Sequence, residues 1–131
     1  MARLTEVEIM KVLAVDDASI MRRIIGRCVS ELGGELLEAE NGQQALDVLA
    51  ANPGQVNLIF LDWNMPVMTG FEALQKIKSD PATKGIPVIM ATTEAGKADI
   101  LKAIAAGASA YIVKPFQKDT MVAKIKEILK L

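Results

Sequence analysis

Five residues whose side chains could take part in chemistry each follow a short apolar segment. They are Asp16, Asp17, Asp62, Thr92 and Lys114. The segments that precede them are residues 11–15, 57–61, 86–91 and 110–113. Together these positions offer three carboxylates, a hydroxyl and an ammonium group. A shared chemical task is plausible only if the fold brings the ends of these segments together.

Clustered carboxylates are costly, and folding does not require them. Two like charges roughly 4 Å apart repel by about 4 kcal/mol at an effective dielectric near 20. A divalent cation would relieve this repulsion, and Mg²⁺ suits a site with few carboxylates because it keeps several waters and accepts phosphate oxygens. Phosphoryl transfer needs positioning and charge neutralisation, which a metal and a lysine supply. An aspartate can act as the nucleophile and become an aspartyl phosphate.

Each of these residues also has an ordinary structural explanation. An aspartate after a strand commonly forms a helix cap or a turn. Asp16 and Asp17 could be such a capping pair, with Ser19 competing for the same role. Thr92 is a common loop or cap residue, and Lys114 could be a solvated charge. The joint placement of all of them after apolar segments is what favours phosphoryl chemistry.

Apolar runs alternate with helical patterns along the chain, which predicts five strand–helix units. The predicted strands are residues 11–15, 35–38, 57–61, 86–91 and 110–113. The predicted helices are residues 19–32, 43–51, 98–106 and 118–131, with a further helix from Gly70 to the break at 79–81. This alternation predicts an α/β fold with a parallel sheet covered by helices on both faces. Since such sheets form their sites at the carboxyl ends of the strands, we expect the five residues to meet at one edge.

The first predicted helix shows how its pattern assigns roles to single residues. Ser19 is positioned to cap it, and Gly33-Gly34 ends it. Its apolar residues are expected on one inward stripe, namely Ile20, Ile24, Ile25, Val29 and Leu32. Cys28 lies among them and is interpreted as core filling.

Composition limits the class of protein. The chain has 131 residues, which fits one domain, and its net charge of −1 provides no basic field for nucleic acid or for an anionic membrane. It has no signal pattern and no apolar run of about 20 residues, so we expect a cytoplasmic protein. It contains no histidine, so a phosphohistidine donor would have to be another protein. We predict an N-terminal extension at 1–10, one domain at 11–131, and a monomer.

Three motifs resemble those of response-regulator receiver domains, and within that family the chemotaxis regulators of the CheY type. They are V-D-D-A-S-I-M-R-R at 15–23, L-D-W-N-M-P at 61–66 and G-A-S-A-Y-I-V-K-P-F at 107–116. The resemblance extends from about Lys11 to Leu131. It implies a flavodoxin-like, doubly wound sheet of five parallel strands in the order 2-1-3-4-5 with five helices. That strand order comes from the resemblance and not from the residue pattern.

The resemblance also implies a set of roles at the expected site. Asp62 would be the phosphoacceptor. Mg²⁺ would be held by Asp16, Asp17 and Asp62 together with the backbone carbonyl of Asn64. Lys114 would neutralise a phosphoryl oxygen, and its bond to Pro115 would be cis.

Further implied roles concern switching and the lifetime of the phosphoryl group. Thr92 would bond a phosphoryl oxygen and move towards it, and Tyr111 would then exchange an outward for an inward rotamer. Asn64 and Glu94 would set how fast water removes the group. Trp63 is the only tryptophan and would report binding by fluorescence. Two residues depart from the usual pattern: Thr69 replaces an acidic residue, and Thr93 replaces a small one.

The implied function is a phosphorylated switch of a two-component system, and not an enzyme. A histidine kinase would donate the phosphoryl group, and a target would bind the face made by the fourth helix, fifth strand and fifth helix. A flagellar motor switch protein is a candidate target, and a phosphatase is a candidate second partner. Because the last helix runs to the final residue, we expect the signal to leave through protein contacts.

Other functions fit these residues less well. A phosphorelay or twitching-motility receiver remains an alternative. Phosphatases of the haloacid dehalogenase type carry D-x-D after the first strand, whereas here the motif follows the third strand and reads Asp62-Trp63-Asn64. A flavodoxin would need a phosphate loop in place of Asp16-Asp17. A pseudo-receiver that only binds partners typically lacks an acid, the threonine or the lysine, and none is missing here.

Overall fold

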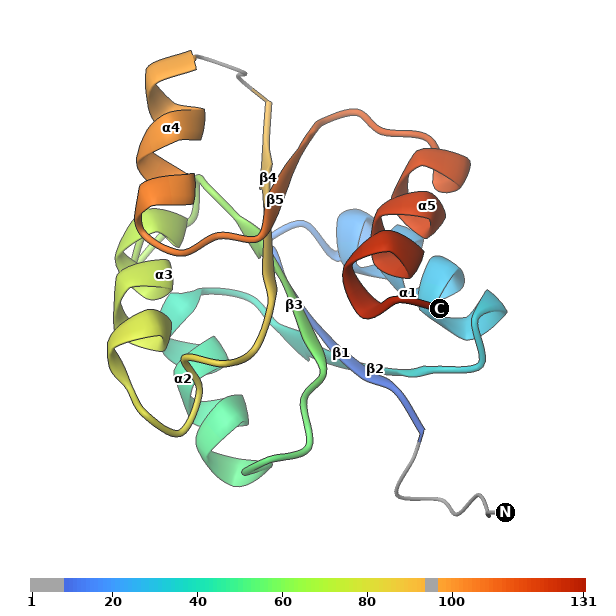
Figure 1. Ribbon diagram of the computed structural model, residues 1–131, viewed down its shortest axis with the longest axis horizontal. Helices are drawn as coiled ribbons and strands as arrows, with labels where there is room; N and C mark the ends of the chain where they lie inside the picture. Colours follow the sequence, from blue (N-terminus) through green and yellow to red (C-terminus); the bar gives the residue numbers. More distant parts are fainter. Residues whose placement is uncertain (1–8, 94–96) are drawn as a thin grey trace.

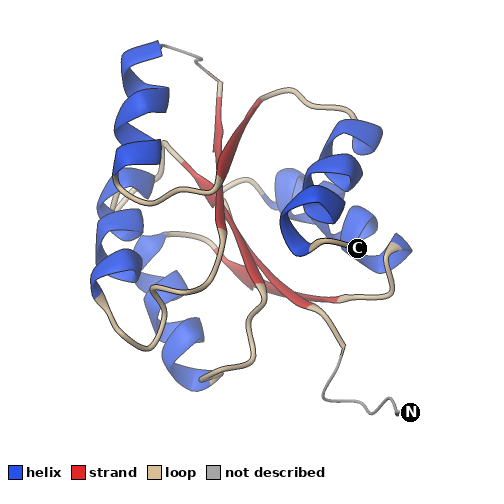
Figure 2. Cartoon of the chain, in the orientation of Figure 1, coloured by secondary structure: helices blue, strands red, loops and turns tan. Residues whose placement is uncertain are grey.

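A single parallel sheet forms the middle layer of the molecule. The computed structural model describes residues 9–93 and 97–131. The strands are β1 (Lys11–Val15), β2 (Glu35–Ala39), β3 (Leu58–Asp62), β4 (Val88–Thr92) and β5 (Ala110–Val113). They are all parallel and lie in the order β2-β1-β3-β4-β5 (Figures 1 and 2). The predicted fold class and strand order are therefore confirmed.

Helices cover both faces of this sheet. They are α1 (Ser19–Glu31), α2 (Gly42–Ala51), α3 (Gly70–Ser79), α4 (Lys97–Ala105) and α5 (Lys118–Leu129). Helices α1 and α5 lie on one face, and α2, α3 and α4 lie on the other (Figure 1). The central strand β3 is buried on both faces: Leu58 and Phe60 pack towards α1 and α5, whereas Ile59 and Leu61 pack towards α2 and α3. This explains its uninterrupted apolar sequence.

Three strands, β2, β3 and β4, each end one residue later than predicted, and two of them end on a polar residue of the expected site. Asp62 is the last residue of β3 and Thr92 is the last residue of β4. Sheet hydrogen bonds hold the main chain at both positions: Trp63 N–H, just after Asp62, donates to the Ala91 carbonyl at 2.9 Å, and the Thr92 carbonyl accepts from Lys114 N–H at 2.7 Å. Asp62 and Thr92 are therefore part of the sheet and not of the loops that follow it.

The predictions for the start of α1 were wrong in two respects. Ser19 does not cap the helix: Ala18 occupies the N-cap position, and the Asp16 carboxylate accepts a hydrogen bond from Ala18 N–H at 2.9 Å. Ile20 does not face inward but is 64% exposed. The packed stripe is centred on Ile25 and its neighbours, and at 3.6 residues per turn Ile20 lies about 140° away from Ile25 around the helix. Cys28 is fully buried, as expected for core filling.

Helix α3 begins at an unusually close approach to the sheet. A Cβ atom on Gly70 would overlap the Asp62 carbonyl oxygen, so only glycine fits here. Gly70 N–H donates to the Trp63 carbonyl at 2.9 Å. Thr69 caps the helix and forms a capping box with Glu72. The threonine that replaces an acidic residue therefore has a structural role at the start of α3.

Candidate functional site

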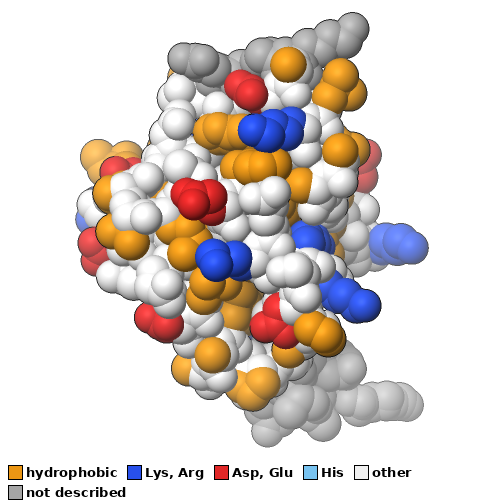
Figure 3. Space-filling view, turned by 90° about the vertical axis from the view of Figure 1, so that its left-hand side faces the viewer, with side chains coloured by type: hydrophobic (Ala, Val, Ile, Leu, Met, Phe, Trp, Pro, Cys, Tyr) orange, Lys and Arg blue, Asp and Glu red, His pale blue; other side chains and the backbone are white. Residues whose placement is uncertain are grey.

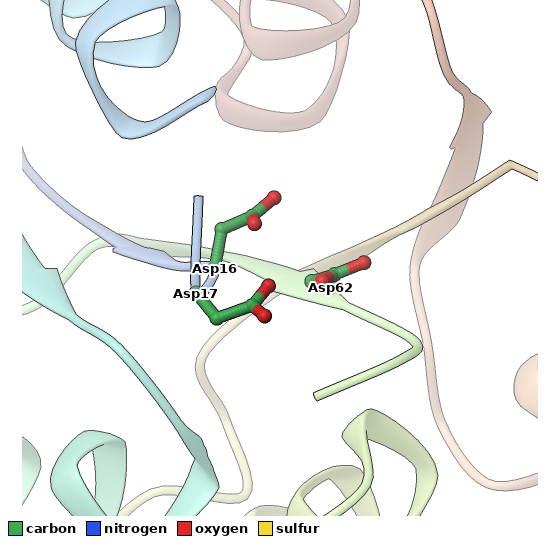
Figure 4. A group of neighbouring side chains, drawn as sticks. All are labelled: Asp16, Asp17 and Asp62. Atoms are coloured by element: carbon green, nitrogen blue, oxygen red, sulfur yellow. The ribbon is translucent and has the colours of Figure 1, made fainter. Parts of the chain in front are cut away.

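Three carboxylates converge at the carboxyl edge of the sheet. Asp16 and Asp17 follow β1, and Asp62 ends the neighbouring strand β3, where Val15 is paired with Leu61. The three side chains point into the same space (Figure 4), and one oxygen atom from each lies within 4.8 Å of the others. Asp16 and Asp62 are buried, whereas Asp17 is exposed. The predicted meeting of these acids is confirmed, and Asp17 forms the solvent side of the cluster.

Lys114 brings a positive charge into this cluster from β5, the strand at the edge of the sheet. It directly follows β5, and its ammonium donates to Asp16 Oδ2 at 2.7 Å and to Asp62 Oδ1 at 3.0 Å. Burial alone would lower the pKa of Lys114, but the hydrogen bonds to the two carboxylates outweigh it, and the pKa is raised. Lys114 is therefore held in its charged form. The predicted cis bond between Lys114 and Pro115 is present.

The environment of Asp62 disfavours its charged form. The pKa of Asp62 is raised, chiefly by burial and further by the negative charge of Asp16. Hydrogen bonds from Lys114 and from the Asn64 backbone oppose this shift without cancelling it. Lys114 therefore does not by itself offset the burial of Asp62 and the repulsion from Asp16.

The donor atoms of this cluster fit a divalent cation. Three carboxylates and one ammonium leave an excess of two negative charges, and carboxylate oxygens are the ligands that Mg²⁺ and Ca²⁺ prefer. The open side at Asp17 leaves room for water and a phosphate oxygen, which Mg²⁺ favours over a closed protein cage. The site residues therefore suit the predicted Mg²⁺. The use of the Asn64 carbonyl as a ligand stays a prediction.

The predicted switch residues lie on the neighbouring strands β4 and β5, beyond Asp62, where Tyr111 is paired with Met90, two residues before Thr92. Thr92 is buried at the end of β4, and Tyr111 on β5 is 36% exposed. Both line a narrow space between the sheet and α4, together with Trp63 and Ile100. Their proximity is compatible with the predicted coupling, which stays a prediction. Glu94 lies outside the described residues.

Sequence reasoning missed two residues that shape the site. Gly70 was expected only to open a helix, yet its missing side chain allows α3 to approach Asp62. Arg22 was noted only as part of a motif, yet its guanidinium donates to the Asp16 carbonyl at 2.6 Å. Both contacts are made to main-chain carbonyl groups. Every residue has such a group, so the sequence does not show which residue is contacted.

The model of the response regulator receiver domain matches residues 12–126. The chain belongs to this family. Chemotaxis protein CheY1 of Helicobacter pylori is 47% identical over 121 residues, which cover 92% of this chain and 97% of that protein. A CheY homologue of Campylobacter jejuni is 44% identical over 121 residues, covering 92% of each chain.

Solved structures agree with this assignment. Chemotaxis protein CheY4 of Vibrio cholerae superposes with a TM-score of 0.85 at 33% identity, over 92% of this chain and 99% of that chain. A CheY-like receiver domain protein of Methanospirillum hungatei reaches 0.82 at 29% identity, over 94% of this chain and 95% of that chain. Within residues 9–93 and 97–131, no helix is long and apolar enough to span a membrane.

Proposed function

We propose that this protein is a phosphorylated switch in a chemotaxis two-component pathway, with Asp62 as the phosphoacceptor. One observation carries the proposal: three carboxylates whose oxygens lie within 4.8 Å of one another, with a lysine ammonium bonded to two of them, at the edge of a receiver-domain sheet. The names of the similar Helicobacter and Campylobacter proteins favour chemotaxis over a phosphorelay or twitching-motility role.

The proposed reaction transfers a phosphoryl group from a phosphohistidine of a kinase to Asp62. A carboxylate oxygen of Asp62 forms the new bond to phosphorus while the bond from phosphorus to the imidazole nitrogen breaks, and that nitrogen keeps the electron pair and takes up a proton. Lys114 is placed to neutralise a phosphoryl oxygen. Mg²⁺ bound by Asp16, Asp17, Asp62 and the Asn64 carbonyl would supply charge neutralisation and would orient the group. Glu94 and Asn64 would set the rate of hydrolysis.

The proposed output surface is the face of α4, β5 and α5. Four apolar side chains on α4 and β5 are exposed: Leu101 at 59%, Ile104 at 45%, Val113 at 37% and Tyr111 at 36%. In the view that faces α2, α3 and α4, hydrophobic side chains lie between scattered charged ones (Figure 3). A phosphoryl group held by Thr92 and Lys114 would favour a minor conformation of this face. The target, for which a flagellar motor switch protein is the candidate, would bind that conformation.

The remaining features of the proposal concern the setting of the protein. A histidine kinase would be the donor and a phosphatase a second partner. The protein would act in the cytoplasm as a monomer, without nucleic acid or membrane. It would not be an enzyme, since its chemistry would be confined to gaining and losing its own phosphoryl group.

Incubation with acetyl phosphate and Mg²⁺, followed by intact mass measurement, tests the phosphoacceptor. The wild type should gain the mass of one phosphoryl group, whereas Asp62→Asn should gain none. Asp119→Asn removes an exposed acid at the start of α5 and serves as the matched control, which should label as the wild type does. Equal labelling of wild type and Asp62→Asn would redirect the assignment to another residue.

A further inference from the structure

Arg22 links three elements around the acidic cluster. It is the fourth residue of α1, and its side chain is 13% exposed. Its Nη1 donates to the Asp16 backbone carbonyl at 2.6 Å, and its Nε donates to Glu38 Oε1 on β2 at 2.9 Å. One planar guanidinium therefore joins the end of β1 to α1 and to β2. A guanidinium can hold two acceptors at once because its donors are fixed in one plane.

The carbonyl that Arg22 holds belongs to the peptide between Asp16 and Asp17. Its orientation restrains ψ of Asp16 and φ of Asp17, and these set the direction in which the Asp17 side chain leaves the main chain. Asp16 is held independently, since its N–H donates to the Ala39 carbonyl at 3.1 Å and its carboxylate accepts from Ala18 N–H and from Lys114. Asp17 is exposed. Its direction therefore depends on the main chain that Arg22 fixes.

We propose that Arg22 is a positioning residue for the divalent site. It acts through the Asp16 carbonyl and sets the angle at which Asp17 presents its carboxylate beside Asp16 and Asp62. The proposal rests on the proposed function, because it assumes that these acids bind Mg²⁺. It deepens that function by assigning a role to a residue that would touch neither the ion nor the phosphoryl group.

Charge and geometry predict opposite changes in Mg²⁺ affinity when Arg22 is removed. A guanidinium near a cation site repels the cation, so its removal on grounds of charge alone would tighten Mg²⁺ binding. If Arg22 positions the acid pair, its removal would weaken binding, because outer partners of metal ligands typically contribute 10- to 100-fold in affinity. The sign of the change therefore separates the two roles.

Titration of the full-length protein with Mg²⁺ tests the proposal, with Trp63 fluorescence and calorimetry as independent readouts. Arg22→Met should raise the Kd for Mg²⁺ about tenfold. Arg22→Lys should recover part of this loss, because an ammonium can bond the carbonyl but cannot hold both acceptors in the same geometry. Arg23→Met removes the same charge from the adjacent, exposed position and is the matched control, with a Kd equal to or slightly below that of the wild type.

A urea midpoint for each variant separates positioning from general stability. Glu38→Gln removes the ion pair on β2 but leaves the contact to the Asp16 carbonyl, so it should lower the urea midpoint while changing the Kd less than twofold. If Arg22→Met binds Mg²⁺ as tightly as the wild type or more tightly, the proposal is wrong and the proposed function stands. If the wild type binds no Mg²⁺, the proposed function and this inference both fail. Should Arg22→Met not fold, Arg22→Lys against Arg23→Met decides by the same criterion.

Discussion

Helices α3 and α4 cover the same face of the sheet but are anchored very differently. Helix α3 begins with a capping box and buries Gly70, Ala73, Leu74 and Ile77. In α4, Ala103 is the only buried residue between positions 98 and 105, and Leu101 and Ile104 are exposed. A helix that buries little apolar surface shifts at low cost. Helix α3, which follows Asp62, is therefore firmly anchored, and α4, which follows Thr92, is the helix that shifts at lower cost.

The largest difference between α3 and α4 should appear in the free energy of unfolding when one leucine is removed from each helix. Leu74→Ala deletes a fully buried side chain and should cost about 2–5 kcal/mol in the free energy of unfolding. Leu101→Ala deletes a side chain that is 59% exposed and should change it by less than about 0.5 kcal/mol. Urea unfolding measures both. Equal losses would show that α4 is anchored as firmly as α3.

The cap of α3 should provide the next largest effect. Thr69→Ala removes the hydroxyl that accepts from Glu72 N–H at 3.2 Å and should cost about 1 kcal/mol in stability. Thr69→Ser keeps the hydroxyl and should lose only a small part of this. Thermal or urea unfolding distinguishes the two variants. If Thr69→Ala is as stable as the wild type, the cap does not contribute to the anchoring of α3.

Acid should weaken the same cap. Hydrogen bonds from Thr69 hold the pKa of Glu72 below its ordinary value of 4.5. A carboxyl whose pKa is lowered in the folded state adds stability above its unfolded pKa, and this is lost as the pH falls through the folded pKa. The stability difference between wild type and Glu72→Gln should therefore be constant from pH 7 to about 5 and should shrink below pH 4.5. If the stability difference between wild type and Glu72→Gln persists at pH 2, the charged Glu72 carboxylate is not what stabilises the cap.

The smallest effect should come from the contact that joins the two helices. Lys102 on α4 places its ammonium 4.4 Å from the centre of the Phe71 ring on α3, and that ring lies 5.6 Å from the ring of Trp63. Lys102→Met should cost about 0.5 kcal/mol and should speed amide hydrogen exchange in α4 but not in α3. Lys102→Arg keeps a cation over the ring and should behave as the wild type. Faster exchange in both helices would contradict a contact that restrains α4 specifically.

Much of this arrangement followed from the sequence because apolar periodicity determines which elements form. The order and types of all ten elements were predicted, and their ends were misplaced by only one or two residues. At the first turn of α1, Ile20 was misassigned because it lies about 140° around the helix from Ile25 and so outside the packed stripe. At the site, the meeting of Asp16, Asp17 and Asp62 followed from parallel topology.

What escaped prediction were contacts with the backbone. Arg22 and Gly70 act on carbonyl groups, which every residue possesses, so nothing in the sequence marks the partner. The pairing of Lys114 with Asp16 and Asp62 also depends on how strand ends align across the sheet. Residue types indicated that charge would gather there, but not which atoms would bond.

The hydrogen bond from Gly70 N–H to the Trp63 carbonyl closes the base of the loop formed by residues 64–69. Within that loop Val67 is 81% exposed and adopts a φ of 71°, which is unfavourable for a β-branched residue. The strained residue therefore lies in the loop and not in β3. A loop closed at its base can change in sequence without displacing the strand beneath it. The sequence of this loop can therefore vary while Asp62 stays in place at the end of β3.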